Sequence, residues 1–263
     1  MTLPATDTPP HCLDDVAVLM PAYNGQADVD LTLASFDERP LVHVLIVDDG
    51  STPPIVAPEL ANMHIEVLRM PVNGGIERAL QAGIDAGDRS VPQRLAKQRA
   101  FMEAHPHVAG LGMWTQVVTR AGEPLFMLTP PSDPVDIRRL RFFRSCLAHP
   151  SMMLRIDAVR AVGNYRAMYR SAEDLDLFVR LMERYDCANL PELGLYYELN
   201  EGGISATRRR RQVLSTLRLQ LRYFNVANPY DWLGLGKNLL HLVTPYRALQ
   251  RVKRGLLAAR ASH

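Results

Sequence analysis

The sequence predicts an α/β fold, with a Rossmann-like, mostly parallel central sheet that is flanked by helices and followed by a basic helical tail. Three observations support this prediction: short apolar runs end in loops rich in glycine and polar residues, helical patterns separate these runs, and the last part of the chain is strongly basic. Ligands of such sheets bind beyond the carboxyl ends of the strands. The loops that follow the strands are therefore the first candidates for a binding site.

The first half of the chain alternates strands with helices. Residues 16–20 are wholly apolar and stop at Pro21, as a buried parallel strand does. The other predicted strands are 42–47 and 64–70, and the predicted helices are 28–35 and 74–84. Strand, helix and strand at this spacing indicate parallel pairing, so the loops after the strands should meet along one edge of the sheet. These loops are 21–25, 48–52 and 71–75.

The second half continues the pattern and adds a hairpin, with its turn at residues 120–123. Gly163 is expected to cap a short helix, and Ser171 is expected to be the N-cap of a helix whose first turn carries acids. The predicted helices are 91–106, 134–145, the short one before Gly163, and 171–185; the predicted strands are 107–119, 124–128 and the residues after Pro150.

Composition limits the class of protein. With 263 residues, 47% of them hydrophobic, the chain can bury a core large enough for one domain and an appendage. Residues 1–14 hold three prolines and no apolar run, so we expect a flexible tail without a secretory signal. Cys12, Cys146 and Cys187 lack metal-site spacing, which favours buried free thiols. No segment reaches the roughly 20 uncharged apolar residues that span a bilayer.

The net charge of +2 conceals an uneven distribution. Residues 207–263 hold 12 Lys and Arg and one acid, Asp231, whereas the preceding 206 residues hold 18 basic and 27 acidic residues. Basic residues alternate with leucines in this segment, as in an amphipathic helix that lies on an anionic membrane surface. The alternative is that the leucines pack on the preceding domain while the arginines stay solvated. No groove-reading or aromatic-interleaved motif supports binding to nucleic acid.

Two adjacent acids, Asp48 and Asp49, follow the second predicted strand in the stretch HVLIVDDGST. Like charges at a strand end repel each other, so we expect this position to need negative charge or strong hydrogen-bond acceptors. Gly50 would let the backbone turn tightly, and Ser51 could cap the turn. An ordinary acidic turn is the alternative.

Eight motifs occur in the order that is typical of family 2 glycosyltransferases: VAVLMPAYNG, VLIVDDGST, NGGIERALQAGI, DAGD, PQRLAKQRAFMEAHPHVAGLG, HPSMMLR, VGNY and SAEDLDLFVRLMER. The resemblance covers residues 16–205, and the order is more specific than any single motif. It implies the GT-A fold and the transfer of a sugar from a nucleotide-sugar to an acceptor. It also implies a bacterial enzyme of surface-polysaccharide type.

The resemblance assigns roles to the loops after the first two strands. In the family, the acid that matches Asp49 accepts hydrogen bonds from the nucleotide base, usually uracil, and its neighbour, here Asp48, supports the loop or the nucleoside. A uracil N–H is a donor for which a carboxylate is a strong acceptor. Pro21, Ala22 and Tyr23 are expected to form the other wall of the base pocket, with Tyr23 packing against the ring or serving in ordinary packing.

The resemblance also implies a diphosphate and metal site. Asn73 and Gly74, at the entry of a helix, are expected near the diphosphate or ribose, with helix capping as the alternative. DAGD matches the family's metal-binding acids, so Asp85 and Asp88 are the candidate ligands of Mg²⁺ or Mn²⁺, and Asp85 also belongs to the donor site. Such cations take one or two carboxylates together with phosphate oxygens. Gly87 replaces one acid of the usual motif, so one carboxylate is absent.

The motif AED opens the last predicted helix of the domain. In inverting members of the family, the acid that matches Asp174 is the general base that deprotonates the acceptor hydroxyl. Glu173 and His149 are expected on the acceptor side, with a structural role as the alternative for His149. Asp176 is interpreted as an acid that favours the first turn of the helix.

One departure from the family lies between Ile84 and Asp85. Family members have a buried strand there, between the helix and the metal-binding acids. A helix antiparallel to the sheet ends at the wrong edge for the active site, and the return takes about five extended residues at ~3.3 Å each. A true deletion would weaken metal binding and activity; the alternatives are a segment absent from the given sequence, or a shortened helix that supplies the return.

The resemblance thus implies an inverting, metal-dependent glycosyltransferase of hexosyltransferase type, which uses a UDP- or dTDP-sugar and a glycan or lipid-linked acceptor. The expected organisation is a flexible tail at 1–14, a GT-A domain at 15–205 and a basic amphipathic tail at 206–263. We expect a cytoplasmic protein, peripheral on the inner face of the cell membrane. The alternative is a catalytically weakened relative that binds a nucleotide-sugar or an assembly partner.

Overall fold

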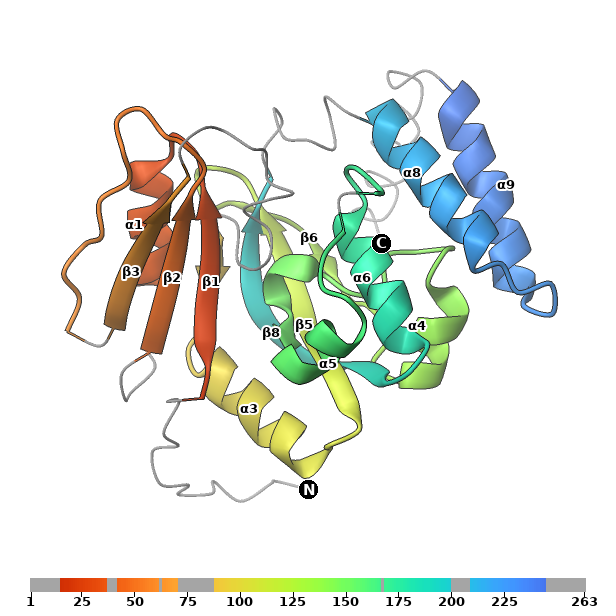
Figure 1. Cartoon of the computed structure of the whole chain (residues 1–263), viewed down its shortest axis with the longest axis horizontal. Coiled ribbons are helices and arrows are strands. Elements are labelled where there is room, and N and C mark those ends of the chain that lie inside the picture. The colour runs from red at the N-terminus through yellow and green to blue at the C-terminus, as the bar shows by residue number, and fades with distance from the viewer. Residues whose placement is uncertain are drawn as a thin grey trace.

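The computed structural model describes residues 15–36, 42–61, 63–70, 88–166, 168–199 and 209–244. A parallel three-stranded sheet opens the chain, with its strands in the order β1-β2-β3 (Figure 1). These strands are β1 (Ala17–Ala22), β2 (Val42–Asp48) and β3 (Met63–Arg69), and helix α1 (Gln26–Ala34) follows β1. Val29 and Leu33 of α1 are buried against the apolar residues of β1 and β2, which fixes the helix on the sheet.

A second, mixed sheet follows, with its strands in the order β4-β8-β5-β6. Its long strands β5 (Val108–Val118) and β8 (Asp186–Glu198) are parallel, while the short strands pair antiparallel with them. The short strands are β4 (Arg89–Ser90), β6 (Pro124–Leu128) and β7 (Met153–Leu154). The mixed α/β architecture with a parallel sheet confirms the predicted fold class.

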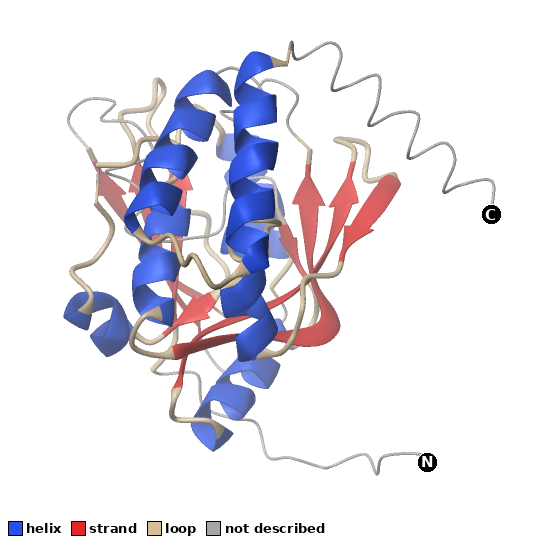
Figure 2. Ribbon diagram, turned by 90° about the vertical axis from the view of Figure 1, so that its right-hand side faces the viewer, coloured by secondary structure: helices blue, strands red, loops and turns tan. Residues whose placement is uncertain are grey.

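Helices cover the second sheet and extend beyond it. The remaining helices are α3 (Arg94–Ala104), α4 (Pro134–Leu140), the 3-10 turn η1 (His149–Ser151), α5 (Ile156–Ala161), α6 (Glu173–Met182), α8 (Arg209–Arg222) and α9 (Pro229–Val243). Figure 2, seen from the side of α8 and α9, shows these two helices next to each other across the front of the molecule. No helix in the described ranges is long and apolar enough to cross a membrane.

The structure tests the predicted helix caps and strands in the second half of the chain. Gly163 has a φ of +86° directly after the end of α5, which confirms its predicted role as a cap. The N-cap prediction for Ser171 is wrong: α6 is preceded by Ala172, and Ser171 itself adopts a left-handed φ of +64°. β8 lies outside the predicted elements, because Pro191 and the residue after it interrupt its alternation and form an irregularity opposite β5.

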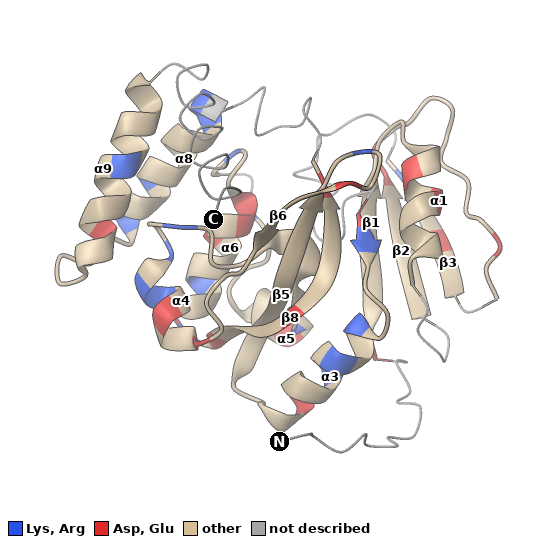
Figure 3. Cartoon of the chain, turned by 180° about the vertical axis from the view of Figure 1, so that it is seen from behind, with Lys and Arg blue, Asp and Glu red and all other residues tan. Residues whose placement is uncertain are grey.

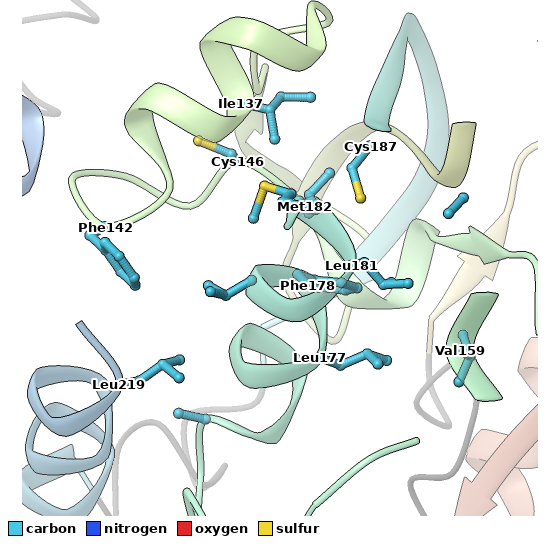
Figure 4. Close-up of a cluster of buried hydrophobic side chains, with 14 of the residues drawn as sticks. Ile137, Phe142, Cys146, Val159, Leu177, Phe178, Leu181, Met182, Cys187 and Leu219 are labelled. Carbon is cyan, nitrogen blue, oxygen red and sulfur yellow. The ribbon is translucent and has the colours of Figure 1, made fainter. Parts of the chain in front are cut away.

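The main hydrophobic core lies between α4, α6 and the second sheet (Figure 4). Leu177 and Leu181 of α6 are completely buried in it, together with Ile137 of α4. Cys146 and Cys187 are buried there as free thiols, as predicted. Burial raises the pKa of Cys146 to about 11 and that of Cys187 to about 12, so both thiols stay protonated at neutral pH.

A cavity separates the two sheets. Among the described residues β1 pairs on one side only, with β2, and its other edge faces a cavity of about 890 Å³. Residues of β1, α3, β7 and α5 line this cavity, including Val18, Leu95 and Met153. The predicted helix 74–84 and the point of the expected deletion lie outside the described residues.

Candidate active site

The first acid of the pair at the end of β2, Asp48, is hydrogen-bonded within its own loop. Asp48 is completely buried, and its carboxylate accepts hydrogen bonds from the backbone N–H groups of Ser51 (2.8 Å) and Ile55 (3.3 Å). Arg69, at the end of β3, donates to the same carboxylate at 3.4 Å. Burial opposes ionisation, but these hydrogen bonds and the Arg69 charge outweigh it, so the pKa of Asp48 lies below its usual value. Asp48 therefore holds the loop in shape.

The same loop is tied to the end of β1. The Asp49 backbone N–H donates to the carbonyl oxygen of Ala22 at 2.9 Å, and the Asn24 N–H donates to Ser51 Oγ at 2.9 Å. Gly50 has a φ of +76°, which is the tight turn that the sequence predicts. These bonds bring the predicted base-binding residues of both loops next to each other.

The other members of the predicted base wall differ in exposure. Pro21 and Ala22, the last residues of β1, are buried, whereas 53% of Tyr23 is exposed beside the Asp49 loop. An exposed aromatic ring at this position has the free face that stacking on a nucleotide base requires. Asn73, Gly74 and Asp85 lie outside the described residues.

Asp88 stands directly before β4, next to the end of β8. Its Oδ1 accepts a hydrogen bond from the backbone N–H of Glu198 at 3.1 Å, and only 2% of the residue is exposed. The Ser90 N–H donates to Ser35 Oγ at 2.8 Å and so joins β4 to the end of α1. Asp88 is thereby fixed beside both sheets.

The donor set around Asp88 can be tested against a divalent cation. No group of three or more His, Cys, Asp and Glu side chains gathers as a metal site within the described ranges. Mg²⁺ and Mn²⁺ sites that act on phosphates use one or two carboxylates and complete their shell with phosphate oxygens and water. A single fixed carboxylate such as Asp88 fits a metal site of this kind.

The three acids in the first turn of α6 have separate partners. Asp176 is completely buried and accepts hydrogen bonds from Arg166 (3.0 Å) and Arg180 (2.8 Å), so it belongs to a structural ion-pair network. Glu173 accepts a hydrogen bond from the Ser171 N–H at 2.6 Å. Asp174 is half-buried, accepts from the Leu175 N–H at 2.7 Å, and lines a pocket.

The pocket at Asp174 has a volume of about 320 Å³. One wall comes from α6 and from residues 141–147 after α4, and the other comes from α8 and α9. The second wall includes Gln212, Thr216 and Lys237, none of which is among the predicted site residues. One signal in the sequence could have identified Lys237, since it is the only basic residue apart from His241 in the otherwise apolar or neutral stretch 232–243.

His149 contacts Tyr165, a residue that lies close enough to Asp174 for the Asp174 charge to act on it. Its Nε2 is 2.7 Å from Tyr165 Oη, and burial, with a smaller effect of the Asp174 charge, raises the pKa of Tyr165 above its usual value. His149 itself lines the cavity between the two sheets rather than the pocket of Asp174. Its contacts with Tyr165 and with the ring of Phe178 are those of a packed side chain.

Topology brings the predicted acids to one end of the molecule. The strands β1, β2, β3 and β8 point toward the same end, and α6 runs back from that end to the start of β8 (Figure 1). Asp49, Asp88 and Asp174 therefore lie on one side of the fold. The pocket at Asp174 has neither Asp49 nor Asp88 among its described lining residues, so this pocket by itself does not join the three acids.

Comparison with known sequences identifies relatives. A family model described as glycosyl transferase family 2 matches residues 17–111. The amylovoran biosynthesis glycosyltransferase AmsE of Erwinia amylovora is 27% identical over 197 residues, which cover 67% of this chain and 73% of that protein. The O-antigen biosynthesis glycosyltransferase WbnJ of Escherichia coli is 24% identical over 196 residues, which cover 68% and 75%.

Comparison with solved structures identifies the fold. The crystal structure of S. aureus TarS matches with a TM-score of 0.60 at 17% identity, over 88% of this chain and 72% of that chain. The mannosyltransferase PcManGT from Pyrobaculum calidifontis, solved with GDP-Man and Mn²⁺, matches with a TM-score of 0.55 at 14% identity, over 94% and 80%. The family model over residues 17–111 and the curated relatives support a family 2 glycosyltransferase, and the shared architecture is that of the GT-A fold.

Proposed function

We propose that the protein transfers a sugar, with inversion at the anomeric carbon, from a UDP- or dTDP-sugar to a glycan or lipid-linked acceptor in the synthesis of a bacterial surface polysaccharide. The names of two relatives, which refer to amylovoran and O-antigen biosynthesis, support the choice of pathway class. The site itself supports the reaction type.

The observation that carries the proposal is the different environment of the acids in α6. The Asp176 carboxylate is hydrogen-bonded to Arg166 and Arg180, whereas the Asp174 carboxylate lines a pocket large enough for a ligand. A carboxylate at a pocket wall can accept the proton of an acceptor hydroxyl as the new C–O bond forms. Asp174 is thus the general base of the proposed reaction.

The donor half of the proposed site lies at the ends of β1 and β2. Asp49 would accept the base N–H, and Tyr23 would pack against the ring. Asp88 would hold Mg²⁺ or Mn²⁺, and a divalent cation bound there offsets the negative charge of the leaving diphosphate. Asp48, with its buried hydrogen bonds, keeps the loop of Asp49 in position.

Calorimetry and turnover test this proposal. UDP with Mn²⁺ should bind the full chain, and binding should weaken when Asp49 is replaced by Ala. Release of UDP from a panel of UDP-sugars, in the presence of a cell-wall acceptor extract, should then identify the donor. Absence of both nucleotide binding and nucleotide release would refute the proposed function.

A second candidate is a catalytically weakened relative that still binds a nucleotide-sugar. The observation that favours it is the cavity of about 890 Å³ beside the edge of β1 that faces the second sheet. If a strand-length segment is deleted before Asp85, a designed apolar insert after Ile84 should pair with β1 and raise the transfer rate. An insert of the same length made of glycine and serine is the control, and an equal rate for both inserts would count against the deletion.

We further propose that α8 and α9 bind an anionic membrane surface from the cytoplasmic side. Figure 3 shows Lys and Arg on both helices. Trp232, Leu240 and Val243, one to three turns apart on α9, are 55%, 58% and 76% exposed, while Arg218 and Arg222 are exposed on α8. Apolar and basic side chains on the outer sides of two neighbouring helices are typical of interfacial binding.

Liposome flotation tests the membrane proposal. The full chain should float with vesicles that contain phosphatidylglycerol and should stay in solution with vesicles of phosphatidylcholine alone. Trp232→Ser combined with Leu240→Ser should lower the bound fraction, whereas Val56→Ser, a change at another exposed apolar residue, should not. Equal binding by both variants would refute this surface.

A further inference from the structure

The pocket at Asp174 carries more positive than negative charge. Among the described residues that line it, Arg141, Arg144 and Lys237 are basic and Asp174 is the one acid. Arg141 is held at 3.5 Å from Asp231, outside the pocket lining, so its charge is partly offset. Two cations therefore remain to balance Asp174 and to attract a further anion.

These two cations have only neutral partners among the described residues. Arg144 donates to the carbonyl oxygen of Thr129 at 3.1 Å, and Lys237 donates to the carbonyl oxygen of Phe143 and lies 5.5 Å from the centre of the Phe143 ring. No ion pair within the described ranges involves either side chain. Burial lowers the pKa of Lys237, which shows that its ammonium group has lost part of its hydration. An anion in the pocket would compensate this loss.

Lys237 is held in the pocket by the packing of α9. The Asp231 carboxylate in the first turn of α9 accepts hydrogen bonds from the Asn228 side chain (2.7 Å) and the Asn225 N–H (2.9 Å). A Cβ on Gly234 would lie 2.6 Å from the carbonyl oxygen of Phe142, so only glycine permits this close approach of the helix. The Asp231 bonds order the first turn of α9, and the close approach at Gly234 fixes the helix against residues 141–147. Lys237 follows Gly234 by less than one turn.

We propose that this pocket is the acceptor site and that it selects an acceptor with an oxyanion, a phosphoryl or a carboxyl group, bound by Lys237 and Arg144 while a hydroxyl of the same molecule meets Asp174. The inference rests on the proposed function, since it gives Asp174 its role. A Lys and an Arg form charge-assisted hydrogen bonds with either oxyanion.

The size of the pocket agrees with a small ligand. Ligand pockets span about 300–1,000 Å³, and 320 Å³ lies at the lower end of that range. The pocket is thus suited to one terminal unit of an acceptor. The phosphoryl group of a lipid carrier and the carboxyl group of an acidic sugar are two sources of the same chemistry.

Calorimetry with matched pairs of probes tests the inference and separates the two sources. The full chain is titrated with geranyl phosphate against geraniol, and with glucuronic acid against glucose. At least one charged probe should bind tenfold or more tightly than its neutral counterpart, and Lys237→Met and Arg144→Gln should each remove most of that preference. A preference confined to geranyl phosphate indicates a lipid phosphate, and one confined to glucuronic acid indicates an acidic sugar.

Lys97→Met and Arg160→Gln are the matched controls, because neither residue lines the pocket. Both should keep the preference for the charged probe. The inference is overturned if neither charged probe is preferred, or if the preference survives in Lys237→Met and Arg144→Gln, whose folding is checked by thermal unfolding. Titration with UDP and Mn²⁺ is run in parallel, so that a failed donor site is distinguished from a neutral acceptor pocket.

Discussion

The two halves of the candidate site are built in different ways. On the donor side, Asp48, Asp49, Gly50 and Ser51 are neighbours in the chain, and the hydrogen bonds that shape them are local or reach only to the adjacent strands. On the acceptor side, Asp174 and Lys237 come from helices far apart in the sequence. A loop motif can therefore specify the donor half, whereas the acceptor half depends on how α8 and α9 pack.

The largest expected effects come from two neighbouring acids of α6 with different partners. Asp174→Asn removes the proposed base and should lower kcat by about 10²–10⁴-fold, with little change in the free energy of unfolding. Asp176→Asn leaves the buried Arg180 without its counter-charge, which should cost about 3–5 kcal/mol of stability. Steady-state kinetics and urea unfolding measure both quantities. If Asp174→Asn keeps full activity, the assignment of the base is wrong.

A smaller effect should come from the packing of α9. Gly234→Ala forces the helix away from the carbonyl oxygen of Phe142 and should cost about 1–3 kcal/mol, as overpacking does. It should weaken binding in the acceptor pocket and leave the binding of UDP unchanged, because α9 packs against α8 and α4 in the described part of the chain. Gly236→Ala is the control, since a Cβ there meets nothing within 4 Å. Equal unfolding midpoints for the two variants would show that the close approach is not needed.

The smallest effect concerns acid pH and the donor loop. The folded-state pKa of Asp48 lies below its usual value, so its ionised carboxylate contributes stability that is complete above the unfolded pKa of about 3.9. That contribution is lost as the pH falls through the lower, folded-state pKa. The stability difference between the wild type and Asp48→Asn should therefore shrink below about pH 4. Urea unfolding between pH 6 and pH 3 measures it, and a pH-independent difference would contradict this role.

Much of the fold could be predicted because its signals are local. The apolar run of β2 ends in acids and a glycine, and the structure has a buried strand and a turn with positive φ there. β8 was not predicted, because the irregularity around Pro191 breaks the alternation of inward and outward side chains along the strand. Ser171 is not the N-cap of α6, because its backbone is left-handed. The pattern of residue types in a sequence does not reveal a local irregularity of the backbone such as a bulge or a positive φ.

The sequence by itself determined the α/β fold, the resemblance to the family and the acids at the ends of the strands, because each depends on residues that are close together in the chain. Only the tertiary structure decided which acid of α6 lines a pocket. Asp174 and Asp176 share one helical turn and one chemistry, and their difference arises from Arg166 and Arg180 packing against one of them. Likewise, Lys237 reaches the pocket because α9 packs closely at Gly234, a contact between segments distant in the chain.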